Sequence, residues 1–263
     1  MLALVTGRGG LPARVAAAQV EPPLICVLDG FAPDGLAADI TFRLEHLGSL
    51  LCDLKARGVT DVCLCGAIER PAFDPAALDA ATRPLVPVIM QAFGAGDDGA
   101  LRAVMALFEQ HGFTIRAAHE LAPDILAPEG ILTQKQPSGG VINDLARADA
   151  VLQALAPLDV GQGCVVGAGQ VWGIETIGGT NHMLHSLPDK VRAANALFVK
   201  APKTDQDLRA DMPAIGPDTI DAVANAGLAG LVIEAGRIIL LDPEETVKRA
   251  DAADLLFWSR RSG

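Results

Sequence analysis

Residues 1–30 read MLALVTGRGGLPARVAAAQVEPPLICVLDG, and they contain the pattern that decides the fold. A short apolar run, Leu2 to Val5, ends at a glycine-rich turn, and a helical pattern follows over residues 11–19. A second apolar run covers residues 24–28. The order strand, helix, strand with short connections is typical of a parallel βαβ unit, whose crossover is right-handed.

The same alternation continues through the first half of the chain. Expected helices cover residues 44–57, 74–93 (interrupted by prolines) and 97–111, and expected strands cover residues 62–64 and 114–117. This series predicts a parallel sheet with helical crossovers. We therefore expect an α/β protein whose N-terminal domain, residues 1–130, is Rossmann-like.

The second half has a different pattern. Residues 123–142 are punctuated by proline and glycine, which places a domain boundary near residue 130. A helix is then expected to begin at Asn143 as its cap, and hairpins are expected around Gly167-Ala168-Gly169 and around Ala235-Gly236. The result is a mixed α+β C-terminal catalytic domain, residues 131–263, with the active cleft between the two domains.

Composition narrows the classes of partner. The 263-residue chain has a net charge of −11, which argues against nucleic acid and against electrostatic adsorption to an anionic membrane. A lipid would instead need an apolar pocket. No segment reaches the about 18 apolar residues of a membrane span, and no charged leader precedes a long apolar run. We expect a soluble, cytoplasmic protein with at most peripheral contact with the inner membrane, and a homodimer is compatible with these observations.

The cysteines give no sign of a metal or disulfide framework. There are five of them, an odd number, with no CxxC pair, and most lie inside apolar runs. We expect reduced, buried thiols that behave as small hydrophobic residues.

The stretch richest in candidate site residues is Lys200 to Gly216, which reads KAPKTDQDLRADMPAIG. Carboxylates are ligands for Mg²⁺-like ions, and Lys and Arg neutralise phosphoryl oxygens. The stretch therefore suits a site that holds both a divalent cation and a phosphate. The competing interpretation is a solvated loop whose charges pair with one another. Several prolines stiffen the loop, which favours the functional interpretation.

A second candidate is the turn Gly7-Arg8-Gly9-Gly10, which follows a strand and opens a helix. Backbone N–H groups in this context can cradle a phosphate. The turn matches neither GxGxxG nor a P-loop, so a plain tight turn remains an equal alternative.

His182 and His185 are three residues apart, which is a weak zinc signal without a third ligand. No GxSxG motif supports a nucleophilic serine.

Three motifs, through their order and spacing along the chain, carry a resemblance to a known family. They are QDLRADMPAIGPDTI at residues 206–220, the opening Gly7-Arg8-Gly9-Gly10-Leu11-Pro12, and Asp159-Val160-Gly161-Gln162. Together they resemble the UDP-2,3-diacylglucosamine pyrophosphatases of the lipid A pathway, in the form typical of alphaproteobacteria and unrelated to the calcineurin-like enzymes. The resemblance covers nearly the whole chain and is strongest over residues 196–242.

The resemblance implies a hydrolase acting on a phosphoanhydride. Water would attack the α-phosphorus of UDP-2,3-diacylglucosamine, and the products would be UMP and lipid X, 2,3-diacylglucosamine 1-phosphate. The cofactor would be Mg²⁺ (or Mn²⁺), held by Asp207 and/or Asp211, and the sequence does not choose the essential carboxylate. The implied catalytic residues are Asp207, Asp211, Lys203 and Arg209. The implied substrate-binding residues are Gly9, Gly10, Leu11, Pro12, Thr180, Asn181, Lys200 and Gln206.

The chain departs from the family at two places. The family's EGTD reads Gly178-Gly179-Thr180-Asn181 here, and Thr204-Asp205 replaces Pro-Gly. The first departure supports an alternative function, a non-catalytic nucleotide- or lipid-binding protein of the same fold. A Rossmann dehydrogenase is disfavoured by the incomplete glycine fingerprint.

Overall fold

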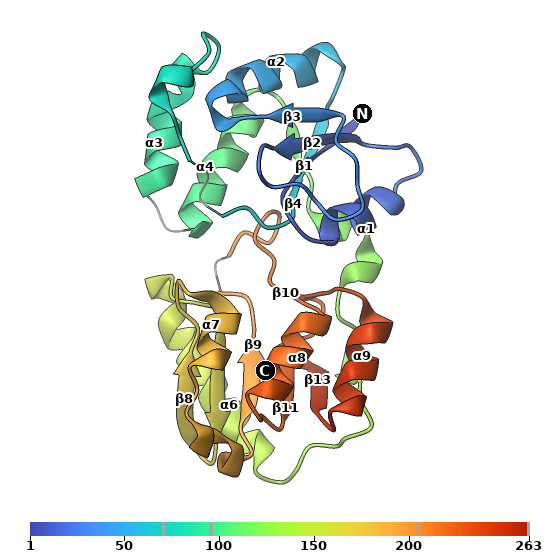
Figure 1. Ribbon diagram of the computed structural model, residues 1–263, viewed down its shortest axis with the longest axis vertical. Coiled ribbons are helices and arrows are strands. Elements are labelled where there is room, and N and C mark those ends of the chain that lie inside the picture. Colours follow the sequence, from blue (N-terminus) through green and yellow to red (C-terminus); the bar gives the residue numbers. More distant parts are fainter. Residues whose placement is uncertain (70–71, 95–96, 205, 262–263) are drawn as a thin grey trace. The chain divides into compact units, whose positions relative to one another are not determined.

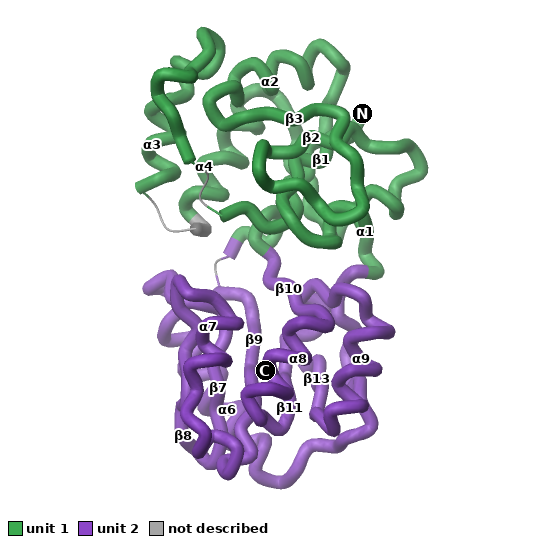
Figure 2. The backbone as a smooth tube through the Cα atoms, in the orientation of Figure 1, with its two compact units in different colours: residues 1–124, 207–211 green, residues 125–206, 212–263 purple. Residues whose placement is uncertain are grey.

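The computed structural model describes residues 1–69, 72–94, 97–204 and 206–261. The chain forms two compact units (Figure 2). The first consists of Met1–Asp124 together with Asp207–Asp211, and the second of Ile125–Gln206 together with Met212–Gly263. Residues 207–211, which the sequence places in the C-terminal domain, thus pack with the N-terminal unit.

The first unit is built on a five-stranded sheet in the order β3-β2-β1-β4-β5, and every neighbouring pair is parallel (Figure 1). Its strands are β1 Leu2–Thr6, β2 Leu24–Leu28, β3 Ile40–Phe42, β4 Asp61–Cys65 and β5 Thr114–Ile115. Its α-helices are α1 Leu11–Ala17, α2 Leu47–Ala56, α3 Val86–Gly94, α4 Asp97–Gln110 and α5 Ala118–Leu121. Short 3-10 turns cover Leu44–His46, Pro75–Ala77, Arg83–Leu85 and Pro123–Ile125.

The central strands of this sheet are largely apolar because both of their faces are covered. In β1, β2 and β4 every residue after the first is buried. Ala3 and Val5 lie on one face, and they share a core with the leucines of α2 and with Phe108 of α4. The parallel sheet expected from the apolar runs is confirmed, and the expected helix over residues 74–93 is indeed interrupted.

The second unit is built on a six-stranded mixed sheet in the order β6-β13-β11-β9-β7-β8. These strands are β6 Gly130–Ile131, β13 Leu256–Arg260, β11 Gly230–Glu234, β9 Leu197–Lys200, β7 Gly163–Gly167 and β8 Gln170–Ile174. A separate parallel pair joins β10 Ala214–Ile215 to β12 Ile239–Leu240. The helices are α6 Val141–Leu155, α7 Gly179–His185, α8 Pro217–Asn225 and α9 Pro243–Ala252, with 3-10 turns at Ala156–Leu158 and Asp189–Ala194.

Two cores cover the two faces of this six-stranded sheet. Val165 and Phe198 point to the face that also packs residues of α7, α8 and α9. Cys164 and Val199 point to the opposite face, which packs Leu145 of α6. Because successive strand residues alternate between faces, both sets of strand residues must be apolar, as they are.

Two details of the second half were predicted wrongly. The turn at Ala235-Gly236 does not close a hairpin, since β12 pairs with β10 and not with β11. The N–H of Ile239 donates to the carbonyl of Pro213, which draws the segment away from β11. Asn143 is not the cap of α6 either, because the helix begins earlier, after Gly140. The hairpin of β7 and β8 around Ala168 is confirmed.

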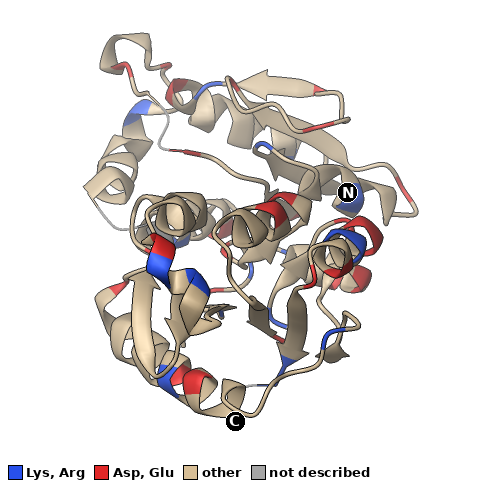
Figure 3. Ribbon diagram, turned by 60° about the horizontal axis from the view of Figure 1, so that its bottom comes forward, with Lys and Arg blue, Asp and Glu red and all other residues tan. Residues whose placement is uncertain are grey.

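Charged residues occur on both units, and most of the cysteines are buried. Acidic and basic residues are scattered over the helices and loops of both units (Figure 3). All five cysteines are free thiols, and only Cys52 is exposed. Burial raises the pKa of the Cys26 and Cys164 thiols to about 12, as expected for sulfur packed as a small hydrophobic group. None of the helices in the described part of the chain has the length and hydropathy needed to span a bilayer.

Candidate active site

The charged loop that the sequence singles out is divided between the two units. Lys200 to Gln206 belongs to the second unit, residues 207–211 belong to the first, and the chain returns to the second unit at Met212 (Figure 2). Asp205 lies outside the described residues. The predicted site residues therefore form separate groups, and each group is described within its own unit.

The first group surrounds Lys200, the last residue of β9. Its Nζ donates a hydrogen bond to Thr180 Oγ1 at 2.8 Å and lies 3.3 and 3.4 Å from the two carboxylate oxygens of Glu175. Thr180 Oγ1 in turn donates to Glu175 Oε1 at 2.9 Å. The side chains of Lys200 and Glu175 are only 10% and 11% exposed. Lys200 is thus a largely buried cation with its counter-ion beside it.

Two glycines make room for Glu175. A Cβ at Gly161 would lie 2.0 Å from the carbonyl oxygen of Glu175, and a Cβ at Gly163 would lie 2.7 Å from its Oε2. The Glu175 N–H donates to the carbonyl of Gly163 at 2.8 Å. The Gly161-Gln162-Gly163 motif therefore serves a close approach between the strand entrance and this carboxylate. The buried Oε1 of Gln162 has no hydrogen-bond partner among the residues described.

The second group lies just after β9. Lys203 Nζ forms an ion pair with Asp159, whose backbone has a left-handed conformation at φ 56°. The N–H of Lys203 donates to Gln206 Oε1 at 2.9 Å, and the N–H of Gln206 donates back to the Lys203 carbonyl at 3.3 Å. Gln206 is buried and closes a turn, so its side chain shapes the loop directly.

The third group lies in the first unit. Arg209 Nε and Nη2 donate to the carboxylate of Asp207, and Nη1 donates to Glu109 Oε1 of α4 at 2.7 Å. Hydrogen bonds from Arg209 hold the pKa of Asp207 below its ordinary value, even though burial opposes that shift. Asp211 is half-buried, and its N–H donates to the carbonyl of Asp207, which closes a single turn. Ala210 packs against the core of this unit.

The opening turn also lies in the first unit. Gly7 is required by a close approach, because a Cβ there would lie 2.4 Å from the carbonyl oxygen of Ala67. Gly9 has φ 94°, a conformation that favours glycine, and Gly10 caps α1. Leu11 and Pro12 form the first turn of that helix. The turn has the expected strand–glycine–helix context.

The side chain of Arg8 contacts the loop after β2. Its Nη2 donates to the carbonyl of Gly30 at 3.0 Å, and its guanidinium lies 4.9 Å from the centre of the Phe31 ring. An ion pair with Glu69 at 3.9 Å is long and exposed. Arg8 therefore braces the loop after β2.

Comparison with known proteins adds the deciding observation. The family models of the LpxI N-terminal domain and the LpxI C-terminal domain match residues 1–125 and 128–258. The chain belongs to the LpxI family. It is also similar to the UDP-2,3-diacylglucosamine pyrophosphatase LpxI of Caulobacter vibrioides, with 35% identity over 95% of this chain and 94% of that protein.

The departure from the expected LpxI pattern at residues 178–181 lies at the start of α7. A Cβ at Gly178 would lie 2.7 Å from the ring of His182, so any larger residue there requires that ring to move. Asn181 is exposed, and its carbonyl accepts a hydrogen bond from His185 Nδ1 at 2.7 Å. His185 is thus engaged with its own helix. No group of three or more His, Cys, Asp or Glu able to hold a metal occurs among the described residues.

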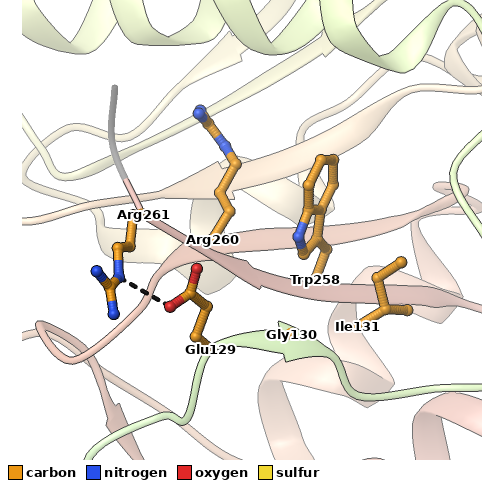
Figure 4. Close-up of a pocket in the computed structure, with 6 residues that line it drawn as sticks. All are labelled: Glu129, Gly130, Ile131, Trp258, Arg260 and Arg261. Carbon is orange, nitrogen blue, oxygen red and sulfur yellow. Dashed lines mark ion pairs between the residues drawn. The ribbon is translucent and has the colours of Figure 1, made fainter.

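A hollow of about 600 Å³ in the second unit shares no residue with these groups (Figure 4). Figure 4 shows Trp258 and Ile131 on one side of it and the ion pair between Arg261 and Glu129 on the other. Its lining residues are Glu129, Gly130, Ile131, Trp258, Arg260 and Arg261. None of them was singled out from the sequence.

Three residues of these candidate groups were not predicted as site residues from the sequence. Asp159 and Glu175 pair with Lys203 and Lys200, and Glu109 pairs with Arg209. Asp159 could have been found, because it begins a motif that was already recognised. Glu109 lies on a helix with no motif, and only the folded chain brings it to its partner.

Proposed function

We propose that this chain hydrolyses the pyrophosphate bond of UDP-2,3-diacylglucosamine to UMP and lipid X, a step of lipid A biosynthesis. The observation that carries the proposal is the 35% identity, over nearly the full length of both chains, to a protein named for that activity. The Lys, Arg, Gln and Asp residues of the expected motif are present in order at Lys203, Gln206, Asp207, Arg209 and Asp211.

The first unit is proposed to be Rossmann-like. Its strand order, β3-β2-β1-β4-β5, agrees with the dinucleotide-binding arrangement, in which the turn after β1 meets a phosphate. Gly9, Gly10, Leu11 and Pro12 follow β1 and are the proposed nucleotide-binding residues of this unit. The active cleft expected between the two domains stays a prediction.

Positive charge is the main contribution we assign to the site. The substrate's diphosphate is anionic and repels an attacking water, so fixed cations stabilise the charge that develops on its oxygens. Lys200, Lys203 and Arg209 are the proposed cations, and Thr180 and Gln206 are the proposed hydrogen-bonding residues beside them. Asn181 would stand where the family carries an acid. All three cations are held by carboxylates, which fixes their positions before substrate binds.

A divalent metal, Mg²⁺ or Mn²⁺, is proposed as cofactor. Mg²⁺ commonly uses one or two carboxylates together with substrate phosphates, so a site shared with the diphosphate suits a chain with no larger ligand cluster in its described part. Asp207 and Asp211 are the candidate ligands, and Asp207 would have to release Arg209 to serve. When bound, the metal would lower the pKa of water and screen the diphosphate.

The acyl chains of the substrate need an apolar environment. Each buried CH₂ contributes about 0.8 kcal/mol, so two chains can provide strong binding without a basic membrane patch. A dry cavity for them, peripheral contact with the inner membrane and a homodimer all remain proposals.

The direct test is release of UMP from UDP-2,3-diacylglucosamine with Mg²⁺, with Mn²⁺ and with a chelator. We expect metal-dependent release by the wild type, and strong loss in at least one of Asp207→Asn and Asp211→Asn. If both variants keep wild-type rates, neither carboxylate has the proposed role. If the chelator has no effect, the metal proposal is wrong while the hydrolase proposal stands.

A second function is favoured by one observation, the Gly178 and Asn181 departure. A protein that has lost two acids there could bind the lipid nucleotide without turnover. Calorimetric binding of the substrate with no UMP released would select this alternative, and binding with release would exclude it.

A further inference from the structure

We propose that Glu175 is a positioning residue, which acts through Thr180 to orient the ammonium group of Lys200 toward the substrate diphosphate. The inference rests on the proposed function, because it assigns Lys200 and Thr180 to that substrate. Glu175 lies between β8 and α7, and it is not among the residues predicted for the site.

The chemistry of the three groups fixes the direction of every hydrogen bond between them. An ammonium can only donate and an ionised carboxylate can only accept. The Thr180 hydroxyl between them must therefore accept from Lys200 Nζ, at 2.8 Å, and give its one proton to Glu175 Oε1, at 2.9 Å. The hydroxyl has no rotational freedom left. Glu175 therefore fixes the orientation of the Thr180 oxygen that accepts the hydrogen bond from Lys200.

The contacts of Lys200 are unequal. Its bond to Thr180 is short, whereas its contacts to the two Glu175 oxygens are 3.3 and 3.4 Å, longer than the 2.7–2.9 Å typical of charge-assisted hydrogen bonds. A phosphoryl oxygen can take over one of the long contacts while the short bond to Thr180 remains. Lys200 thus keeps its position and charge compensation while it offers an N–H to the substrate.

The backbone around Glu175 holds the carboxylate in place. The N–H of Glu175 donates to the carbonyl of Gly163, and the absence of side chains at Gly161 and Gly163 allows this close approach. Gly163 is also the register partner of Lys200 across β7 and β9. One local backbone arrangement therefore places both ends of the chain of hydrogen bonds.

The role is tested first by kinetics. Glu175→Gln keeps the size of the side chain and an acceptor but removes the charge, and Thr180→Val removes the hydroxyl. We expect each to lower kcat for UMP release by about tenfold to about a hundredfold, with a smaller change in KM. Because both act on Lys200 through one chain of contacts, the double variant should be no slower than the slower single variant. Wild-type kcat in Glu175→Gln, or multiplied effects in the double variant, would overturn the proposal.

Asp149→Asn is the matched control. It removes the carboxylate of another ion pair in the same unit, between Asp149 of α6 and Arg260 of β13. A merely structural loss would lower stability in both this control and Glu175→Gln and leave kcat of the folded fraction unchanged. We expect Asp149→Asn to lose stability with kcat of the folded fraction unchanged, whereas Glu175→Gln should also lose kcat.

A second readout does not depend on activity. Lys200 is labelled with an amine-specific acylating reagent and compared by peptide mass spectrometry with Lys248, whose side chain is 77% exposed. We expect slow labelling of Lys200 in the wild type and clearly faster labelling in Glu175→Gln and Thr180→Val. If the wild type releases no UMP, the proposed function fails, and the labelling still decides the role of Glu175. Unchanged labelling in both variants would refute that role. If Glu175→Gln does not fold, Thr180→Val alone decides both readouts.

Discussion

The Lys200 group of the second unit and the Arg209 group of the first use the same chemistry in different surroundings. Lys200 and Glu175 are about nine-tenths buried, whereas the side chains of Arg209 and Glu109 are 40% and 43% exposed. Removing one member of a buried pair leaves an uncompensated charge away from water, while water replaces the partner of an exposed one. Ion pairs of the same kind in the two groups should therefore respond very differently to substitution.

The largest effect is expected from Lys200→Met. Glu175 would stay buried with only Thr180 as partner, so we expect the free energy of unfolding of the second unit to fall by about 3–5 kcal/mol. Trp172 and Trp258 both lie in this unit, so urea unfolding followed by tryptophan fluorescence reports on it.

A compensating variant serves as the control for that measurement. In Lys200→Met/Glu175→Leu both charges are gone, so most of the lost stability should return. A loss below about 1 kcal/mol in the single variant would mean that water reaches Glu175, which would weaken the contrast with the Arg209 group.

The next effect in size is that of Gly163→Ala. The added methyl would lie 2.7 Å from Glu175 Oε2 and 2.6 Å from the ring of Phe198, so the carboxylate or the ring must move. Overpacking of this kind costs about 1–3 kcal/mol. Gly139→Ala is the matched control, since its Cβ would have nothing within 4 Å. Equal stability of the two variants would show that the carboxylate has room to shift.

Acid should affect the first unit through carboxylates with lowered pKa. Hydrogen bonds from Arg43 lower the pKa of the buried Glu45 to about 2, and those from Arg209 lower the pKa of Asp207. A carboxylate with a lowered folded pKa stabilises fully above its unfolded pKa, about 4.3 for Glu, and this stability is lost as pH falls toward the folded value. The stability of the first unit should therefore decline from about pH 4.5 to about pH 2.

The acid prediction is checked with Glu45→Gln. Its stability at pH 6 should be lower by about 1.5 kcal/mol, and its decline with acid should be shallower. Hydrogen exchange of β1 and β4 at several pH values measures both, because this unit has no tryptophan. A slope identical to that of the wild type would assign the acid sensitivity to other groups.

The sequence predicts the fold better than the site because the fold leaves a local signal. Apolar runs such as residues 2–5 and 24–28 mark buried parallel strands, whose pattern depends only on neighbouring residues. The two-residue strands β10 and β12 leave no such pattern, and a tight turn near Ala235 was therefore taken for a hairpin. Pairing between distant short segments depends on the whole fold.

For the site, the sequence showed which residue types could do chemistry, but it did not show which of these residues lie together in the fold. The loop from Lys200 to Gly216 suggested one cluster, yet Asp207 and Arg209 pack with the first unit while Lys200 and Lys203 stay in the second. The counter-ions of these groups come from other segments, and no periodicity relates Glu109 to a loop 100 residues away. The sequence thus identifies which groups can do chemistry, and tertiary packing decides which groups meet.

The smallest effect is expected from Glu109→Gln. Arg209 would keep its bonds to Asp207, and water can replace the lost carboxylate, so the stability of the first unit should fall by only about 0.2–1 kcal/mol. The effect should shrink further in 1 M salt, where screening acts within about 3 Å. Hydrogen exchange at residues 207–211 is the sensitive measurement, because the pair ties that turn to α4. A loss as large as that of Lys200→Met would show that the exposed pair supports the turn as strongly as the buried pair supports its sheet, and the contrast between the two groups would then not hold.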